Sequence, residues 1–190
     1  ERLTTLSLIP EFRKEILIVS VQTAMHRVVP SEWVASHSFS LVKGEVLDRE
    51  KFRKKLVDNG YRSSPQVSES GEYAIRGSLI DVFPVGSDNP IRIDFFDNEI
   101  ETLRMFDVET QRSTQEVKEI RVLPGKEFLL DQSGVSRFRR QWRTEFGQFH
   151  DVDLYRDVSE GLPPPGIEYY LPLFHDRMEL LADYFSEDTI

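Results

Sequence analysis

The sequence contains no cysteine among its 190 residues, and this absence excludes several kinds of chemistry together. Disulfide bonds, cysteine-ligated zinc and thiol nucleophiles all require a thiol group. The chain also contains no apolar run that approaches the length of a membrane helix, and no signal peptide precedes its first residue. We therefore expect a cytoplasmic protein that makes no membrane contact. Because the first residue is Glu1 rather than methionine, we also expect an excised or processed piece of a larger protein.

The signatures of nucleotide-binding and catalytic sites are missing as well. No G-x-x-x-x-G-K-[ST] loop and no G-x-G-x-x-G loop occurs, and Gly125-Lys126 lacks both the upstream glycine and the following hydroxyl residue. No histidine lies at metal-ligand spacing from another, and no G-x-S-x-G elbow is present. A Ser-His-Asp site needs only three distant residues, but nothing in the sequence points to one. We expect no catalytic residue, no cofactor and no metal site in this chain.

The residues that are present are typical of an ordinary globular protein. Apolar residues make up 39% of the chain and charged residues 30%, which places it outside the disordered class. The 13 phenylalanines and 6 tyrosines predict a core dominated by aromatic packing. The formal net charge of −9 repels DNA on average, although a local basic patch can still bind it. A protein partner with a basic or mixed surface fits this charge better.

The first zone, residues 1–37, has the pattern of an α/β domain. Residues 16–19 (Ile-Leu-Ile-Val) form a continuous apolar run, as expected for a strand buried on both faces. Ser20 is placed to cap a helix over residues 21–27. One strand and one helix cannot form a sheet, so we interpret this zone as the end of a parallel-sheet domain whose earlier strands are missing.

The second zone, residues 38–124, begins with a strand at 39–42 and a helix at 49–58 that Asp48 caps. The hydrophobic period then changes to two, which is typical of half-buried strands. The candidate strands are 72–76, 79–83, 91–96, 102–105 and 117–122. Residues 84–90 and Asp97-Asn98 supply turn-forming residues between them. We predict an antiparallel meander with one helix packed on it.

The third zone, residues 125–190, is mainly helical in pattern. Apolar residues recur at helical spacing over 133–146, and a second short helix is predicted over 152–160. Residues 167–174 and 178–185 are apolar and aromatic, so they need a surface to pack against. We expect that surface to be the interrupted sheet of the first zone.

The strand at 91–96 carries the most informative pattern. Successive side chains of a strand point to opposite faces, so Ile91, Ile93 and Phe95 share the core face. Arg92, Asp94 and Phe96 then share the other face, where a large aromatic residue is out of place for packing alone. Arginine and aromatic residues are enriched in protein interfaces, and Arg76 of a neighbouring strand can join them. The alternative is that the chain itself covers Phe96 and that a carboxylate pairs with Arg92; the pattern favours neither.

Two further sites are weaker alternatives. The acidic residues Asp94, Asp97, Glu99 and Glu101 predict a Mg²⁺ site of a metal-dependent nuclease if they converge, although clustered surface charge is the ordinary case. The polar side of the predicted helix at 133–146 carries a row of arginines that can contact nucleic acid, or can instead form a solvated or ion-paired face. These are Arg137, Arg139, Arg140 and Arg143.

Two long motifs give the chain a family resemblance. Residues 71–84 (GEYAIRGSLIDVFP) and 91–101 (IRIDFFDNEIE) resemble the UvrB-homology region of the bacterial transcription-repair coupling factor (Mfd) family. Residues 106–113 and 166–174 favour this family over UvrB itself. The resemblance covers nearly the whole chain.

The resemblance implies a fold and a division into domains. It implies the end of a UvrB-like domain 1a over 1–37, a domain 2 over 38–124 and a domain 1b over 125–190. The implied fold class is α/β and α+β. A partial helicase-like parallel α/β domain, built from 1a and 1b, would carry domain 2 as an inserted, mainly antiparallel β-meander with a packed helix.

The resemblance also implies a function. The family recruits the excision-repair protein UvrA to stalled RNA polymerase in transcription-coupled nucleotide excision repair, and domain 2 is its UvrA-docking part. Its docking arginines and aromatic residue correspond to Arg76, Arg92 and Phe96 of this chain, and Asp94 is a possible addition to that face. The full-length protein is implied to be an ATP-dependent DNA translocase that also contacts double-stranded DNA and masks this face with its own C-terminal domain. The ATP site and the DNA-gripping hairpin of UvrB are absent from these residues, so we expect no enzyme activity here.

Overall fold

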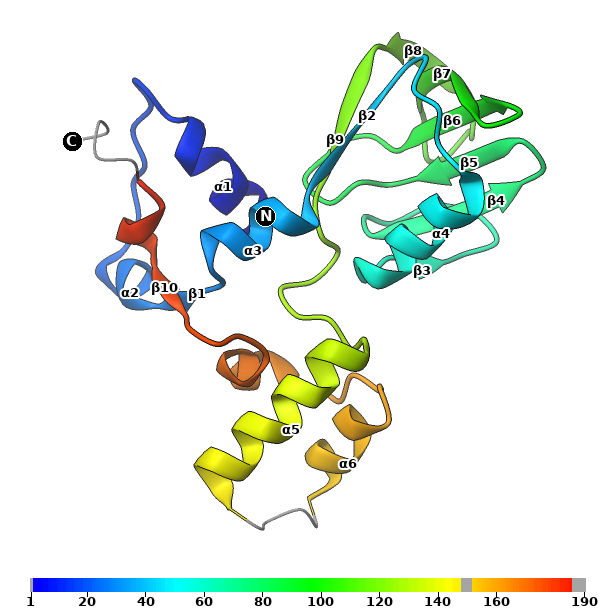
Figure 1. Cartoon of the computed structure of the whole chain (residues 1–190). Coiled ribbons are helices and arrows are strands. Elements are labelled where there is room, and N and C mark those ends of the chain that lie inside the picture. The colour runs from blue at the N-terminus through cyan, green and yellow to red at the C-terminus, as the bar shows by residue number, and fades with distance from the viewer. Residues whose placement is uncertain (1, 148–151, 186–190) are drawn as a thin grey trace. The chain divides into compact units, whose positions relative to one another are not determined.

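A six-stranded sheet is the largest element of the computed structural model, which describes residues 2–147 and 152–185 (Figure 1). Its strands, in spatial order, are β3 (Arg62–Ser63), β4 (Glu72–Arg76), β5 (Leu79–Val82), β6 (Ile91–Phe96), β7 (Glu99–Phe106) and β8 (Ser113–Val117). Neighbouring strands are antiparallel except for the short parallel pair β3–β4. None of the described helices combines the length and the apolar character needed to span a bilayer.

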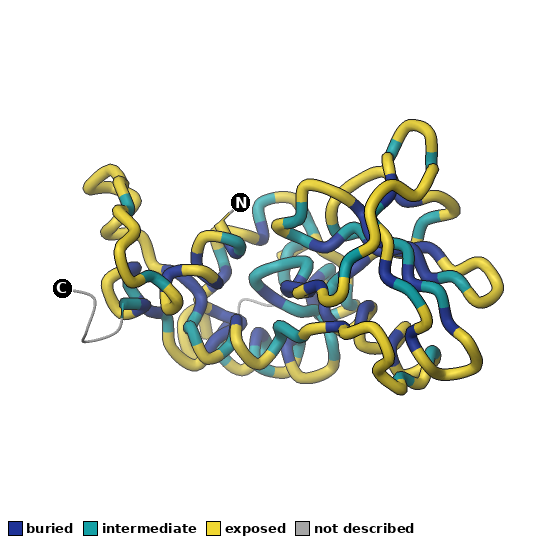
Figure 2. Tube along the Cα trace, turned by 90° about the horizontal axis from the view of Figure 1, so that it is seen from above, coloured by how far each residue is buried: buried dark blue, intermediate teal, exposed yellow. Residues whose placement is uncertain are grey.

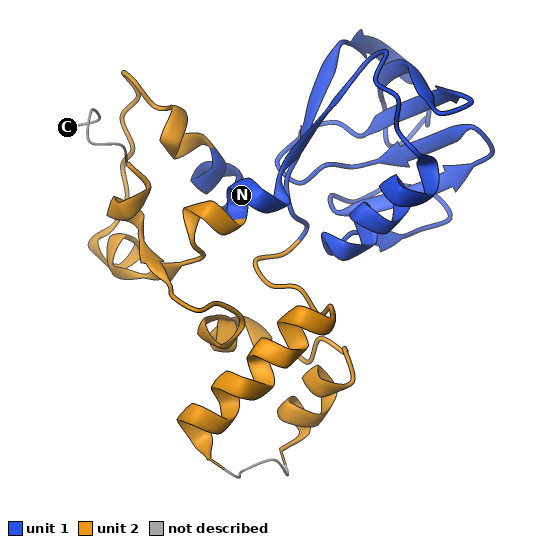
Figure 3. Ribbon diagram, viewed as in Figure 1, with its two compact units in different colours: residues 1–7, 34–125 blue, residues 8–33, 126–190 orange. Residues whose placement is uncertain are grey.

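The chain divides into two compact units, each formed by two separate stretches (Figure 3). Residues 1–7 and 34–125 form unit 1, and residues 8–33 and 126–190 form unit 2. The few residues outside the described part of the chain belong to the first and third predicted domains. The assignment of the chain to three UvrB-like domains stays a prediction.

One face of the sheet in unit 1 is covered by helix α4 (Arg49–Asp58). Phe52 and Leu56 lie one turn apart on this helix, and both are fully buried against Ile80, Ile93 and other core residues of the sheet. The side chain of Asp48 accepts a hydrogen bond from the backbone N–H of Lys51 and so begins the helix as the sequence predicted. Along β6, buried positions alternate with intermediate or exposed ones. Figure 2 shows buried residues in dark blue, intermediate ones in teal and exposed ones in yellow. The predicted meander with one packed helix is confirmed.

Unit 1 also contains a separate pair of strands. Strand β2 (Phe39–Val42) pairs antiparallel with β9 (Glu119–Val122). The sequence predicted one strand over 117–122, but the chain changes partner at Lys118, because β8 pairs with β7 whereas β9 pairs with β2. Ile120 and Val122 are buried against the same core as α4.

Unit 2 is built mainly from helices that pack through aromatic rings. Its elements are η1 (Ile9–Glu11), α2 (Val21–Met25), β1 (Arg27–Val28), α5 (Gln132–Phe146), α6 (Asp153–Ser159), η2 (Ile167–Phe174), β10 (Glu179–Leu180) and η3 (Leu181–Tyr184). Helices α1 (Arg2–Leu8) and α3 (Ser31–His37) cross the boundary between the units, and most of each lies in unit 1. On α5, the ring of Phe138 stacks on that of Phe174, with 5.2 Å between the ring centroids. The ring of Trp142 contacts that of Tyr155, with 5.5 Å between the centroids. The apolar segment 167–174 therefore packs on α5, and β10 pairs with β1.

The prediction of a buried strand over residues 16–19 is wrong. These residues belong to no strand, and Ile16 and Ile18 are 86% and 89% exposed. A strand needs a neighbour for its backbone N–H and C=O groups, and no described strand lies beside this segment. In the described residues, the parallel sheet predicted for the first and third zones is accordingly replaced by helices and the short antiparallel pair β1–β10. The prediction of a mixed fold with a mainly antiparallel sheet is confirmed.

The buried hydroxyl of Tyr61 provides a test of this packing. It donates to the carbonyl oxygen of Leu123 at 2.8 Å and accepts from the backbone N–H of Val85 at 3.1 Å. Burial raises the pKa of the phenol, so the hydroxyl keeps its proton. We expect Tyr61→Phe to lower the free energy of unfolding of unit 1 by about 2 kcal/mol, because two buried groups lose their partner.

Urea denaturation followed by far-ultraviolet circular dichroism measures this change. Tryptophan fluorescence is unsuitable, because Trp33 and Trp142 both lie in unit 2. The control is Tyr169→Phe. Tyr169 is 89% exposed, so removal of its hydroxyl leaves no buried group without a partner. Equal stability of the two variants would contradict the assigned role of the Tyr61 hydroxyl.

Candidate protein-docking face

The face of the sheet opposite α4 brings the predicted site residues together. In the strand register, Arg76 lies opposite Leu79, Leu79 opposite Asp94, and Asp81 opposite Arg92. Opposed residues of an antiparallel ladder point to the same side, so the predicted residues share one face. We call this side the open face. Its members are Arg76, Leu79, Asp81, Arg92, Asp94, Phe96, Thr102 and Arg104.

Phe96 is a large hydrophobic residue of the open face, yet 69% of its surface is accessible. It is the last residue of β6 and lies opposite Glu99, so only Asp97 and Asn98 separate the two strands. Asp97 has a φ of 54°, a conformation that Asp and Asn adopt more readily than most residues. The tight turn holds the ring at the end of the hairpin. No described part of the chain covers it, contrary to the packing alternative left open above.

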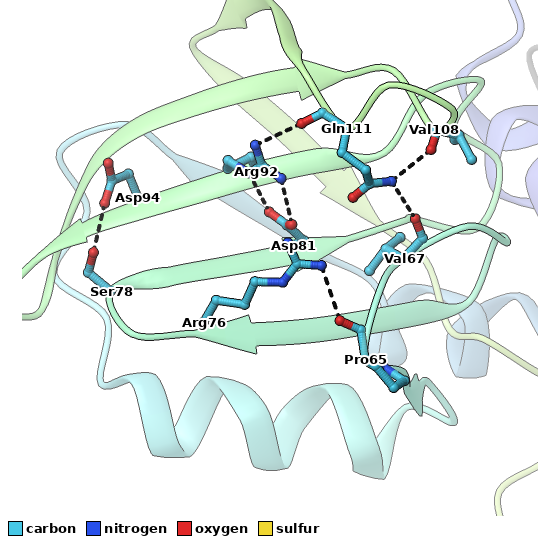
Figure 4. Close-up of polar contacts among 9 residues, drawn as sticks. All are labelled: Pro65, Val67, Arg76, Ser78, Asp81, Arg92, Asp94, Val108 and Gln111. Carbon is cyan, nitrogen blue, oxygen red and sulfur yellow. Dashed lines mark hydrogen bonds and ion pairs between the residues drawn. The ribbon is translucent and has the colours of Figure 1, made fainter.

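Arg92 is held from within the sheet. Its Nε and Nη2 donate to the two carboxylate oxygens of Asp81, each at 2.8 Å, and Nη1 donates to the backbone oxygen of Gln111 at 3.2 Å (Figure 4). Its guanidinium also lies over the ring of Phe106 at 4.8 Å. The hydrogen bond with Asp81 raises the pKa of the arginine, and its side chain is only 18% exposed. Arg92 thus combines a place on the open face with the carboxylate pairing that the alternative predicted.

Two residues that the sequence reasoning missed organise this region. Asp81 is 2% exposed and is the carboxylate that Arg92 requires. The amide nitrogen of Gln111 donates to the backbone oxygens of Val67 and Val108, which ties two loops together over one part of the sheet (Figure 4). Val67 and Phe106 are fully buried beneath them. An acidic residue between two apolar ones, as in Ile80-Asp81-Val82, was the available signal for Asp81.

Arg76 and Asp94 lie on the part of the open face that these loops leave accessible. Arg76 is exposed, and its Nη2 donates to the backbone oxygen of Pro65 at 3.1 Å. Asp94 accepts from the hydroxyl of Ser78 at 3.2 Å. Figure 4 shows Arg76, Arg92 and Asp94 on the same side of the sheet. An exposed ring and an arginine without a carboxylate partner are typical constituents of a protein interface.

The acidic run does not assemble into a metal site. Asp94, Asp97 and Glu99 all belong to the described residues, and within that part of the chain no group of three or more His, Asp or Glu side chains is placed to hold an ion. Asp94 and Glu99 lie on opposed strands, and Asp97 occupies the turn between them. The structure therefore offers no support for the nuclease alternative.

The arginine row of α5 is largely engaged within unit 2. Arg137 donates to the backbone oxygen of Phe174 at 3.1 Å, and Arg140 pairs with Asp176 at 2.8 Å. Arg139 donates to the hydroxyl and the backbone oxygen of Ser159. These contacts fix α5 against α6 and the segment after η2. They give Arg137, Arg139 and Arg140 a structural role within unit 2.

Comparison with known proteins identifies a family for the sheet and relatives for the whole chain. Residues 39–128 match the family described as "UvrB interaction domain". Along its full length the chain is 44% identical to the transcription-repair-coupling factor of Escherichia coli (strain K12) and 41% identical to that of Haemophilus influenzae (strain ATCC 51907 / DSM 11121 / KW20 / Rd). The factor of Staphylococcus aureus (strain MRSA252) is 34% identical over the full chain. The chain spans 17% of the length of each of these relatives.

The Arg92–Asp81 pair predicts different effects for the two arginines of the face. Arg92→Ala leaves the buried carboxylate of Asp81 without its partner, so we expect the free energy of unfolding of unit 1 to fall by about 3 kcal/mol. Arg76→Ala removes an exposed side chain and is expected to change it by less than about 0.5 kcal/mol. Hydrogen exchange of the β5 and β6 amides measures both effects. Similar protection in the two variants would show that the Arg92–Asp81 pair contributes no net stability.

Proposed function

Because this chain belongs to the transcription-repair-coupling factor family, as its sequence motifs predicted, we propose that it is a docking module that binds the excision-repair protein UvrA. The open face is the surface that makes the contact. Phe96 buries its ring at the centre of the interface, and Arg76 makes charge-assisted hydrogen bonds to acidic groups of UvrA. The exposed part of the Arg92 side chain contacts the same partner. Its ion pair with Asp81 stabilises the face by joining β5 and β6. The module has no catalytic role of its own.

The exposed ring of Phe96 carries this proposal. Burying an aromatic side chain is strongly favourable, yet the matched domain leaves this ring 69% exposed, on the same face of the sheet as the exposed Arg76. A rigid two-residue turn holds the ring, so little conformational entropy is lost when a partner covers it. Such a preorganised aromatic anchor at the edge of a polar face supports protein docking better than it supports catalysis.

In the full-length protein, this docking step serves a larger reaction. We propose that it recruits UvrA to RNA polymerase stalled on double-stranded DNA, in transcription-coupled nucleotide excision repair. The C-terminal domain of the same protein covers the face until the protein is engaged. The ATP-dependent translocation belongs to other parts of that protein.

Substitution of the ring tests the proposal. We expect Phe96→Ala to weaken binding to UvrA about 30-fold, which corresponds to about 2 kcal/mol for the loss of one interface anchor. Isothermal titration of the purified chain with UvrA measures the affinity. The side chain is exposed, so the variant is expected to fold normally, which circular dichroism checks.

The matched control is Phe146→Ala, because Phe146 is also partly exposed but lies on α5 of unit 2. It should bind UvrA as tightly as the unmodified chain. A folded Phe96→Ala variant with unchanged affinity would refute this surface as the docking site.

A further inference from the structure

We propose that Arg104 is a further contact residue of the open face, and that it pairs with a carboxylate of the docking partner. This inference rests on the proposed docking function and extends it to a residue outside the predicted site. It also assigns different roles to neighbouring arginines. Arg92 is a positioning residue held inside the domain, whereas Arg104 is available to the partner.

The strand register places Arg104 on the open face, between Arg92 of β6 and Glu116 of β8. It lies directly opposite Arg92 in the β6–β7 ladder and opposite Glu116 in the β7–β8 ladder. Arg104 is exposed, whereas its neighbours Leu103 and Phe106 are fully buried. It therefore lies on a strand that is paired on both sides, and its side chain is accessible to a partner.

Among the described residues, the carboxylates along this row of the sheet are paired with cations other than Arg104. Asp81 and Arg92 satisfy each other through two hydrogen bonds. Glu116 forms an ion pair with Lys43, with 2.6 Å between Nζ and the carboxylate oxygen. This contact is the main cause of the lowered pKa of Glu116. Arg104 adds a weaker through-space effect on Glu116, but its guanidinium makes no hydrogen bond or ion pair with any described residue.

This arrangement has an electrostatic cost that a partner would remove. Two like charges directly opposite each other in an antiparallel pair destabilise the sheet, and here Asp81 compensates only Arg92. A carboxylate that approaches Arg104 from outside neutralises the remaining charge and satisfies several N–H donors. Arg76, the other exposed arginine of the open face, donates to the backbone oxygen of Pro65 and pairs with no carboxylate of the described residues. We infer that the segment of the partner that covers this face is acidic.

Titration calorimetry with UvrA tests the role of Arg104. We expect Arg104→Gln to weaken binding about tenfold, since it removes a charge-assisted hydrogen bond. Arg104→Lys keeps the charge but loses the forked geometry, so it is expected to lose only about threefold. The control is Lys51→Gln, which removes one positive charge from α4, on the other face of the same sheet, and should change the affinity less than twofold. Circular dichroism confirms the fold of each variant.

The outcomes separate the two proposals. If the unmodified chain does not bind UvrA, the docking function itself is wrong. If the unmodified chain binds UvrA, the docking function stands. If Arg104→Gln and Lys51→Gln then change the affinity by the same factor, whether small or large, the assignment of Arg104 is wrong. A loss confined to Arg104→Gln, with partial retention in Arg104→Lys, supports the contact.

Discussion

The ion pair between Arg92 and Asp81 is the constraint on which the open face depends. It joins two neighbouring strands on the side that α4 leaves uncovered, and it extends to a loop through the backbone oxygen of Gln111. A largely buried carboxylate needs a partner of opposite charge and full hydrogen bonding, which the forked guanidinium supplies. The open face therefore has two parts on either side of this pair. One part lies under loops with Val67 and Phe106, and the other, with Arg76 and Phe96, is left to the surroundings.

The elements set by local pattern could be predicted, and those set by neighbours could not. Helix α4 begins after Asp48 and buries Phe52 because a cap residue and a 3.6-residue period act within one stretch of chain. The alternation along β6 likewise predicted a buried Ile93 and an outward Phe96. The run at 16–19 has the composition of a buried strand, yet burial requires adjacent strands that its own residues do not specify. The same limit explains why the strand predicted over 117–122 did not show the change of partner at Lys118.

The candidate site shows this limit at the level of single side chains. Period-two alternation placed Arg76, Arg92 and Phe96 on one face but could not say which of them has a partner. Pairing of Arg92 with Asp81 depends on the register between β5 and β6, which the connection through residues 84–90 sets. The arginines of α5 are a parallel case. Their row suggested a nucleic-acid contact, whereas backbone oxygens and Asp176, brought close by packing, occupy three of them.

The distribution of charge favours a protein over a nucleic acid as the partner of this face. The chain carries a formal net charge of −9, and DNA binding normally needs many cations arranged along the phosphate backbone. The open face instead offers two arginines without carboxylate partners, an exposed ring and the carboxylate of Asp94. A carboxylate facing the partner repels phosphate, but it suits a protein surface that carries both signs of charge. The few local cations then select the orientation of the partner, while the ring supplies most of the favourable burial.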